Sequence, residues 1–385
     1  MTDLFIDTPA ELEALCTRLR GHPWLAIDTE FIRERTYRAR LCLVQVASED
    51  DIACIDTLAL DSLDPLIERL LDPTVTKVLH AARQDLEIFH DLTGGRVPAP
   101  VFDTQLAATL AGFGDQIGYA ELVKRLLGVS LDKSQSRTDW SARPLDDEQL
   151  RYAADDVRHL REVYTLLRDR LESAGRLEWL EEDFAALADP AQYRSDPDSA
   201  WRKVRGANQL RGTQLAVLRA LAAWRERQAE AADRPRRWIL DDAALLALAK
   251  SSPTRREQLG KVRGLGESWI RRHGGDLLEL IRAAREAGPG QEAAPRRPRP
   301  LTLPEEARVD ALMALVRLQA NEHDVAPATL ATRRDLEALV RGEEDLALRR
   351  GWRHGLVGKL LDRFLSGDAR LRCDAEELVV EMLGG

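Results

Sequence analysis

The sequence predicts an α/β domain with a mixed β-sheet, followed by two small all-helical domains. Short apolar runs alternate with segments of helical periodicity between residues 24 and 173, a pattern typical of a sheet covered by helices. Segments rich in Pro and polar residues, at 189–198 and 287–304, interrupt the chain, and the residues after each interruption show helical periodicity. A chain of 385 residues is long enough for two or three domains.

The first three predicted strands are 24–31, 41–48 and 51–56, each a short apolar run. A Ser-Glu-Asp turn separates the second strand from the third, so these two are expected to pair antiparallel. The elements that follow are a helix at 62–71, a strand at 76–80, a helix at 84–92, a short strand at 101–102 and helices at 104–111, 119–127 and 147–173. Hairpin-linked strands followed by alternating strands and helices predict a mixed sheet flanked by helices.

The domain boundaries follow from breaks in the helical pattern. The first domain is predicted at 1–195 and a helical domain at 207–286, with helices expected over Leu210–Trp224, over Asp241–Ala249 capped by Asp241 or Asp242, and over Leu277–Ala284. Residues 287–304 hold five prolines and predict an extended linker. Residues 305–385 are expected to form a second helical domain, helical as far as residue 382. The similar length of the two helical domains suggests a degenerate repeat.

Charge is distributed unevenly along the chain, although the net charge is −9. Residues 1–200 hold 22 Lys and Arg against 38 Asp and Glu, whereas residues 201–300 hold 22 against 11. The basic middle segment is therefore the better candidate for contact with nucleic-acid phosphates. The alternative is an ordinary solvated helical surface, and charge alone does not separate the two.

The composition excludes several classes of protein. A hydrophobic content of 44% predicts a soluble globular protein, and the absence of an apolar run of about 18 residues argues against a membrane span. The N-terminal residues are acidic and do not form a secretory signal. Four cysteines are scattered without CxxC pairs, which argues against a zinc site: Cys16, Cys42, Cys54 and Cys373. Cys42 and Cys54 stand in apolar strand-like runs, so we expect them to be small buried side chains in a reducing compartment. We expect a cytoplasmic protein.

Two acidic residues stand in the first predicted strand, whose sequence is WLAIDTEF. Asp28 and Glu30 are two residues apart, so in a strand both side chains face the same side. Two neighbouring carboxylates on an apolar strand repel each other and lose hydration. A hard divalent cation such as Mg²⁺ or Mn²⁺ would reverse that cost, because it prefers oxygen ligands. The alternative is a pair of exposed acids at a strand end.

Two later helices carry further candidates. Asp85 lies in the first turns of the helix at 84–92, where it could also serve as an ordinary favourable charge near a helix N-terminus. Tyr152 and Asp156 are four residues apart in the helix at 147–173, which puts both on one face. Since Val157 and Leu160 are near that face, Asp156 is expected to be partly buried and to need a partner.

The order Asp-x-Glu, Asp and Tyr-x-x-x-Asp resembles the tyrosine-bearing branch of the DEDD exonuclease superfamily. The resemblance narrows to the ribonuclease D family through four segments: HAARQDLEIF at 80–89, FDTQLAA at 102–108, GVSLDKSQSRTDWSARPL at 128–145 and YAADD at 152–156. It covers roughly the first half of the chain, with no departure at the five motif positions. Residues 214–250 resemble the HRDC domain, the C-terminal domain of helicases and ribonuclease D.

The resemblance implies a ribonuclease-H-like fold and a 3′–5′ exoribonuclease that trims tRNA precursors and other small structured RNAs, releasing nucleoside 5′-monophosphates. It also implies two divalent cations, Mg²⁺ or Mn²⁺. Asp28, Glu30 and Asp156 would hold the first, Asp28 would bridge to the second, and Asp85 would hold the second. Tyr152 would orient or deprotonate the attacking water, and an ordinary tyrosine pKa near 10 favours orienting because it makes the residue a poor base. The expected partner is RNA, with no membrane and no obligate protein partner, and the expected state is a monomer.

Other residues have two competing interpretations. Lys133 and Arg137 could hold the scissile phosphate or belong to an exposed loop, and His80 could be a metal ligand or a strand-end histidine bonded to backbone. The default role of Asp103 is a helix N-cap. Four tryptophans of the basic segment could stack on bases, although the helical spacing around Trp224 favours a core position: Trp201, Trp224, Trp238 and Trp269.

Three alternatives to an exoribonuclease remain at this point. A 3′–5′ DNA exonuclease would share every catalytic residue, although the chain contains no polymerase or helicase region. A non-catalytic RNA-binding protein on the same scaffold would lack one or more of the carboxylates, and all four are present. A purely structural acidic protein accounts for neither the motif order nor the basic segment.

Overall fold

The computed structural model describes residues 3–132, 134–135, 138–288, 299–375 and 377–383. The chain divides into two compact units. The first unit combines residues 1–31, 41–193 and 300–385, and the second combines residues 32–40 and 194–299. Each unit therefore combines stretches of the chain that are far apart in the sequence. In particular, residues 32–40 belong to the second unit: they are the loop after the strand with Asp28 and Glu30, together with one strand residue at each end, and are called the loop at 32–40 below.

The first unit contains a six-stranded sheet with the order β1-β4-β3-β2-β5-β6. Its strands are β1 Leu4–Ile6, β2 Trp24–Ile32, β3 Arg40–Ala47, β4 Ile52–Asp56, β5 Thr76–Leu79 and β6 Val101–Asp103. Strands β3 and β4 pair antiparallel, as the turn between them predicted. The pairs β1–β4, β2–β5 and β5–β6 are parallel, so the mixed sheet is confirmed.

Helices cover this sheet at nearly the predicted positions: α2 Asp64–Leu70, α3 Arg83–Leu92, α4 Thr104–Leu110, α5 Tyr119–Leu127 and α6 Asp147–Ser173. The first strand and α1 Pro9–Arg18 were not predicted. A three-residue strand is too short to show periodicity, and β1 is an edge strand that depends on pairing with β4. Further short helices follow α6: η1 Leu177–Leu180, α7 Glu181–Leu187 and η2 Pro190–Gln192.

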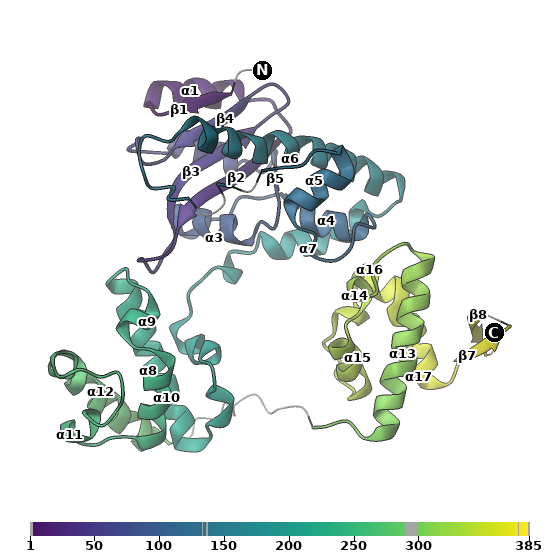
Figure 1. Ribbon diagram of the computed structural model, residues 1–385. Helices are drawn as coiled ribbons and strands as arrows, with labels where there is room; N and C mark the ends of the chain where they lie inside the picture. The colour runs from purple at the N-terminus through teal and green to yellow at the C-terminus, as the bar shows by residue number, and fades with distance from the viewer. Residues whose placement is uncertain (1–2, 133, 136–137, 289–298, 376, 384–385) are drawn as a thin grey trace. The chain divides into compact units, whose positions relative to one another are not determined.

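Alternation along β2 decides which side chains face which layer. Leu25 and Ile27 are fully buried in a core that also contains Phe89 of α3. Trp24, on the opposite face, packs against Tyr164 of α6 with a ring separation of 5.2 Å. Helix α6 crosses the sheet and contacts β4 and β5 (Figure 1). Asp28 and Glu30 share the parity of Trp24, so they lie on the face that α6 covers.

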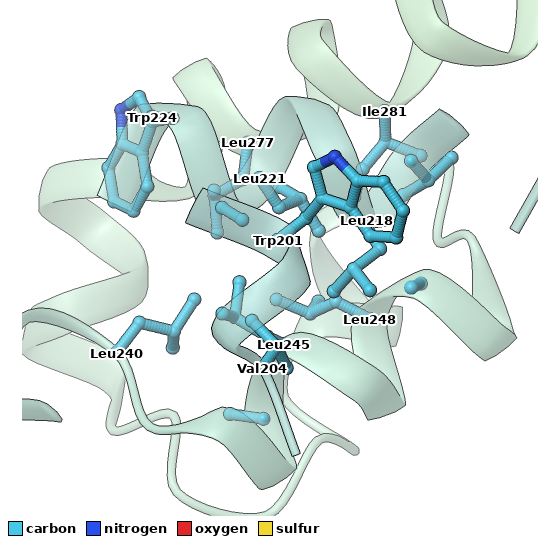
Figure 2. Packing of buried hydrophobic residues seen from close by; sticks show 14 of the residues in the cluster. Trp201, Val204, Leu218, Leu221, Trp224, Leu240, Leu245, Leu248, Leu277 and Ile281 are labelled. Carbon is cyan, nitrogen blue, oxygen red and sulfur yellow. The ribbon is translucent and has the colours of Figure 1, made fainter. Parts of the chain in front are cut away.

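The second unit is helical, as predicted, apart from the loop at 32–40. It contains η3 Pro197–Lys203, η4 Ala207–Gln209, α8 Gly212–Ala231, α9 Arg236–Ile239, α10 Asp242–Ser251, α11 Arg256–Leu259 and α12 Glu267–Ala287. Asp241 is the N-cap of α10, since its side chain accepts a hydrogen bond from Ala244 N. Figure 2 shows Trp201 and Trp224 in the apolar core of this unit, where both are buried. The core interpretation of Trp224 is confirmed.

The C-terminal residues form helices and then a hairpin. The helices are α13 Leu303–Glu322, α14 Pro327–Leu330, α15 Arg333–Val340, η5 Ala347–Arg349, α16 Gly351–Arg353, the short π-helix η6 His354–Gly358 and α17 Lys359–Ser366. The expectation of helix as far as residue 382 was wrong. Gly367, at φ 91°, ends α17, and β7 Ala369–Asp374 then pairs antiparallel with β8 Glu377–Met382. Mixed apolar and charged residues in such short segments do not distinguish helix from strand.

Within the described residues, no helix is both long enough and apolar enough to cross a membrane. Cys16, Cys42 and Cys54 are buried, as expected for the two in strands, and Cys373 is exposed.

Candidate active site

Three carboxylates predicted from distant parts of the sequence meet at one point. Asp28 and Glu30 project from β2, and Asp156 projects from the middle of α6. One carboxylate oxygen from each lies within 4.8 Å of the others, close enough to share a single ion. All three side chains are partly buried. The three acids come together because Asp28 and Glu30 point from the face of β2 that α6 covers, and Asp156 points from α6 toward that face.

Asp85 lies in the first turn of α3 and is buried, with 7% of its surface exposed. Its Oδ1 accepts a hydrogen bond of 2.5 Å from the hydroxyl of Thr29. Thr29 stands between Asp28 and Glu30, so this bond ties α3 to the strand that carries the other acids. Asp85 is not one of the three residues whose carboxylate oxygens lie within 4.8 Å of one another. Its carboxylate lies beside that group, held by the Thr29 hydroxyl.

Burial raises the pKa of every acid in this cluster, and repulsion by the other cluster acids adds to it for Asp28 and Glu30. Burial, and then the charges of Asp156, Asp85 and Glu30, hold the pKa of Asp28 well above its ordinary value. Burial is also the main cause for Glu30, whose pKa rises to about 8. The pKa of Asp156 rises to about 7 through burial and the nearby Asp155, and burial raises that of Asp85 to about 6. Ionising these groups together is costly without a compensating positive charge.

These donors fit divalent cations. Every ligand in the cluster is a carboxylate oxygen, the type that Mg²⁺ and Mn²⁺ prefer over nitrogen or sulfur. A bound cation would favour the ionised form of each acid and so remove the cost that the raised pKa values express.

Tyr152 lies one helical turn before Asp156 on α6, as the spacing predicted. Its ring packs 6.1 Å from that of the buried Trp140. Burial, followed by the charges of Asp156, Glu30 and Asp28, raises the pKa of Tyr152 above its ordinary value. The phenol therefore keeps its proton at neutral pH, which supports a role in orientation over a role as a base.

One further tyrosine was missed. The Tyr119 hydroxyl, from the start of α5, donates a hydrogen bond to the backbone carbonyl of Asp156. Nothing in the local sequence indicates this contact, since it depends on how α5 and α6 pack. Thr29 was also missed, although its position between two acids in the Asp-Thr-Glu segment offered a signal.

The other candidates have structural contacts. His80 bonds through Nδ1 to the Thr104 hydroxyl and through Nε2 to the Ile117 carbonyl, which agrees with a strand-end histidine. Asp103 is the N-cap of α4, where its side chain accepts hydrogen bonds from Gln105 N and Leu106 N. Lys133 and Arg137 lie outside the described residues.

Comparisons with known proteins match both main parts of the chain. A family model described as 3′–5′ exonuclease matches residues 4–172, and the HRDC domain model matches residues 214–281. Ribonuclease D of Gluconacetobacter diazotrophicus is 46% identical over 362 residues, which cover 92% of this chain and 91% of the relative. Ribonuclease D of Granulibacter bethesdensis is 44% identical over 372 residues, covering 96% and 94%.

A solved structure is similar over almost the whole chain. Escherichia coli RNase D, described as an exoribonuclease involved in structured RNA processing, matches with a TM-score of 0.81 and 34% identity. The match covers 95% of this chain and 99% of that one. The catalytic core of RRP6 from Trypanosoma brucei matches with a TM-score of 0.58 and 25% identity, covering 74% of this chain and 80% of that one.

The mixed sheet, the acidic cluster and the matched domains define a 3′–5′ exonuclease followed by an HRDC domain. Identity above 40% over more than nine tenths of the chain then makes the assignment specific. The chain belongs to the ribonuclease D family and is a 3′–5′ exoribonuclease, whose exonuclease fold implies the use of divalent metal.

Proposed function

We propose that this exoribonuclease works through Asp28, Glu30, Asp85, Tyr152 and Asp156, and that the carboxylates hold two divalent cations, Mg²⁺ or Mn²⁺. Asp28, Glu30 and Asp156 would hold the first cation, and Asp28 would bridge to the second, which Asp85 would hold. The observation that carries this proposal is the shared 4.8 Å separation of three carboxylate oxygens from β2 and α6.

Paired cations, when bound, would activate a water and stabilise the leaving 3′ oxygen of the phosphodiester. The protein would supply orientation. The Thr29 hydroxyl fixes the Asp85 carboxylate, and the Tyr119 hydroxyl holds the backbone at Asp156, so both acids are positioned before substrate arrives. Tyr152 would hydrogen-bond the attacking water in its neutral form, since the raised pKa of its hydroxyl disfavours ionisation.

The proposed substrates are the 3′ ends of tRNA precursors and other small structured RNAs, released as nucleoside 5′-monophosphates. The similarity to a relative described as an enzyme of structured RNA processing supports this choice. Lys133 and Arg137 remain proposed contacts to the scissile phosphate. We also propose a cytoplasmic, monomeric enzyme without an obligate protein partner.

We further propose that residues 305–385 are a diverged copy of the HRDC domain at 207–286, joined to it by the linker at 287–304. The order of helices supports a repeat. The 20-residue helices α8 and α13 are each followed, after four residues, by a four-residue helix, α9 or α14. After two more residues α10 or α15 begins, and the residue before each, Asp241 or Thr332, is its side-chain N-cap.

The test is digestion of a labelled tRNA precursor by the full-length protein with Mg²⁺, with Mn²⁺ or with EDTA, read at nucleotide resolution. Stepwise shortening from the 3′ end with either metal, and none in EDTA, is the expected result. Undiminished cleavage in excess chelator would contradict the metal mechanism. Faster degradation of a matched DNA strand than of RNA would instead favour the DNA exonuclease.

A further inference from the structure

The second unit contains a pocket of about 380 Å³ that is separate from the acidic cluster. The loop at 32–40 forms one side, and η3 together with α9 and the residues around it forms the other. Its lining includes Arg33, Tyr37, Lys203, Arg236, Arg237 and Trp238. The volume lies near the lower end of the range for ligand pockets, about 300–1,000 Å³, which suits one unit of a polymer better than a folded molecule.

A buried carboxylate holds the two sides of this pocket together. Glu226 of α8 has 3% of its surface exposed and accepts hydrogen bonds of 2.5 Å from both the Tyr37 hydroxyl and Arg236 Nε. The Arg236 guanidinium also stacks over the Tyr37 ring at 5.1 Å. Burial alone would raise the pKa of Glu226, but the bonds from Arg236 and Tyr37 prevail and lower it.

The backbone of the same loop is fixed as well. Tyr37 N and Arg38 N both donate hydrogen bonds to Asp233 Oδ1, and Arg38 pairs with Glu230 at 2.7 Å. The loop is therefore tied to the end of α8 through side chains and backbone together. A wall held in this way is preorganised, so a ligand would not need to order it.

Apart from Arg33, the cations that line the pocket fall into two groups. Arg236 is neutralised by Glu226, and Arg225 is neutralised by Asp242 at 2.7 Å, so both serve the structure. Lys203 and Arg237 are exposed, and neither forms an ion pair with any residue that the structure describes. These two side chains remain available for an anionic ligand.

An exposed aromatic ring stands beside these cations. Trp238 has 58% of its surface exposed, whereas Trp201 and Trp224 of the same unit are buried in its core. Exposing a large indole to water is costly, and a tryptophan next to unpaired cations is the combination that binds single-stranded nucleic acid. Bases stack on the ring, and phosphates contact the cations.

We propose that this pocket is a second RNA-binding site, which takes one nucleotide of a single-stranded segment away from the cleavage point. Its base stacks on Trp238, and the flanking phosphates contact Lys203 and Arg237. The inference rests on the proposed RNA substrate. Because the loop at 32–40 continues directly from β2, the strand of Asp28 and Glu30 is covalently joined to this site.

The first test compares two charge-matched double variants of the full-length protein, K203A/R237A and K261A/R263A. Each removes one exposed Lys and one exposed Arg from the same unit, but only the first pair lines the pocket. Binding of a labelled single-stranded RNA is measured in EDTA, which prevents turnover, over a range of salt concentrations. For K203A/R237A we expect roughly ten-fold weaker binding near 0.15 M salt and a salt slope lower by about 1.4. An equal loss in both double variants would show diffuse attraction to charge and overturn the proposal.

The second test addresses stacking. Trp238→Ala should weaken binding by about five-fold or more, and Trp238→Phe should restore most of it, because a phenyl ring still offers a face to the base. Thermal unfolding of each variant shows whether the fold is intact, which the exposure of the side chain leads us to expect. Wild-type affinity in Trp238→Ala would refute the site.

Cleavage of a short RNA with Mg²⁺ by the wild-type protein separates the two proposals. An active wild type whose pocket variants bind RNA normally would refute the second site alone. An inactive wild type would refute the proposed function, whereas the binding comparison in EDTA would still decide on the pocket.

Discussion

Replacing Asp28 by Asn should have opposite effects on stability and activity. The oxygens of Asp28, Glu30 and Asp156 lie within 4.8 Å of one another. At that distance, with an effective dielectric constant of about 20, two ionised carboxylates repel by about 3.5 kcal/mol. Asn has nearly the same shape and no charge, so the substitution removes two such repulsions without creating a cavity. With all three acids ionised and their oxygens 4.8 Å apart, the two repulsions that the substitution removes would amount to about 7 kcal/mol in the metal-free protein.

The realised gain should be smaller, because protonation already relieves part of the repulsion. The pKa values of Glu30 and Asp156 are about 8 and about 7, and that of Asp28 is also well above its ordinary value, so all three acids are partly neutral near pH 7. At about pH 8 we expect Asp28→Asn to raise the free energy of unfolding by about 1–3 kcal/mol in EDTA. Hydrolysis should nevertheless be abolished, because the residue proposed to bridge the two cations has lost its charge.

Thermal unfolding in EDTA and in Mg²⁺, together with turnover of a labelled RNA, measures both effects. Asp61→Asn, an exposed acid of the same unit, is the matched control and should change neither quantity. Near-normal turnover of Asp28→Asn would show that Asp28 is not the bridging ligand. A metal-free variant less stable than wild type at pH 8 would refute the argument from charge repulsion.

Three further predictions concern other parts of the molecule. Tyr152→Phe should lower kcat on the order of 10- to 100-fold with little change in KM, since it removes the hydroxyl that we propose orients the water; a matching rise in KM would indicate a substrate contact instead. The pKa of Glu30 is raised from 4.5 to about 8, so its contribution to folding is present below about pH 4.5 and is lost as pH rises to about 8. Added Mg²⁺ should therefore raise Tm more at pH 8 than at about pH 5, and an effect independent of pH would refute the linkage. Glu226→Ala should cost about 1–3 kcal/mol of unfolding free energy, because Tyr37 loses its buried acceptor. Glu230→Ala, whose side chain is 36% exposed, should cost under about 1 kcal/mol, and equal losses in the two variants would show that the buried network has no special role.

Much of the candidate site could be predicted because its signals are local. The two-residue spacing of Asp28 and Glu30 predicts a shared face in any strand, and the four-residue spacing of Tyr152 and Asp156 does so in any helix. The contacts that tie these elements together could not be predicted, because each joins distant residues. The bond from Thr29 to Asp85 spans 56 positions, and that from Tyr119 to Asp156 spans 37. A short sequence pattern does not indicate which distant residues will be in contact.

The same limit applies to the fold. Strands β2 to β6 were predicted because each is an apolar run between predicted helices or turns, whereas β1 stands alone near the N-terminus and exists through its pairing with β4. The hairpin at 369–382 was wrongly predicted as helix. Gly367 ends the preceding helix, and the pairing of two short strands then outweighs the local preference of these residues.

The sequence by itself determined which side chains could act: the acids at their spacing, the aromatic residues of the basic segment and the order of helices. Only the tertiary structure decided which of them meet. Asp28, Glu30 and Asp156 share one site because strand β2 and the crossing helix α6 direct these side chains into the same space between the sheet and the helix. The loop at 32–40 belongs with the HRDC unit because Glu226, buried on α8, binds Tyr37, which lies 189 positions away. Periodicity sets the direction of a side chain within its own element, but packing between elements selects its partner.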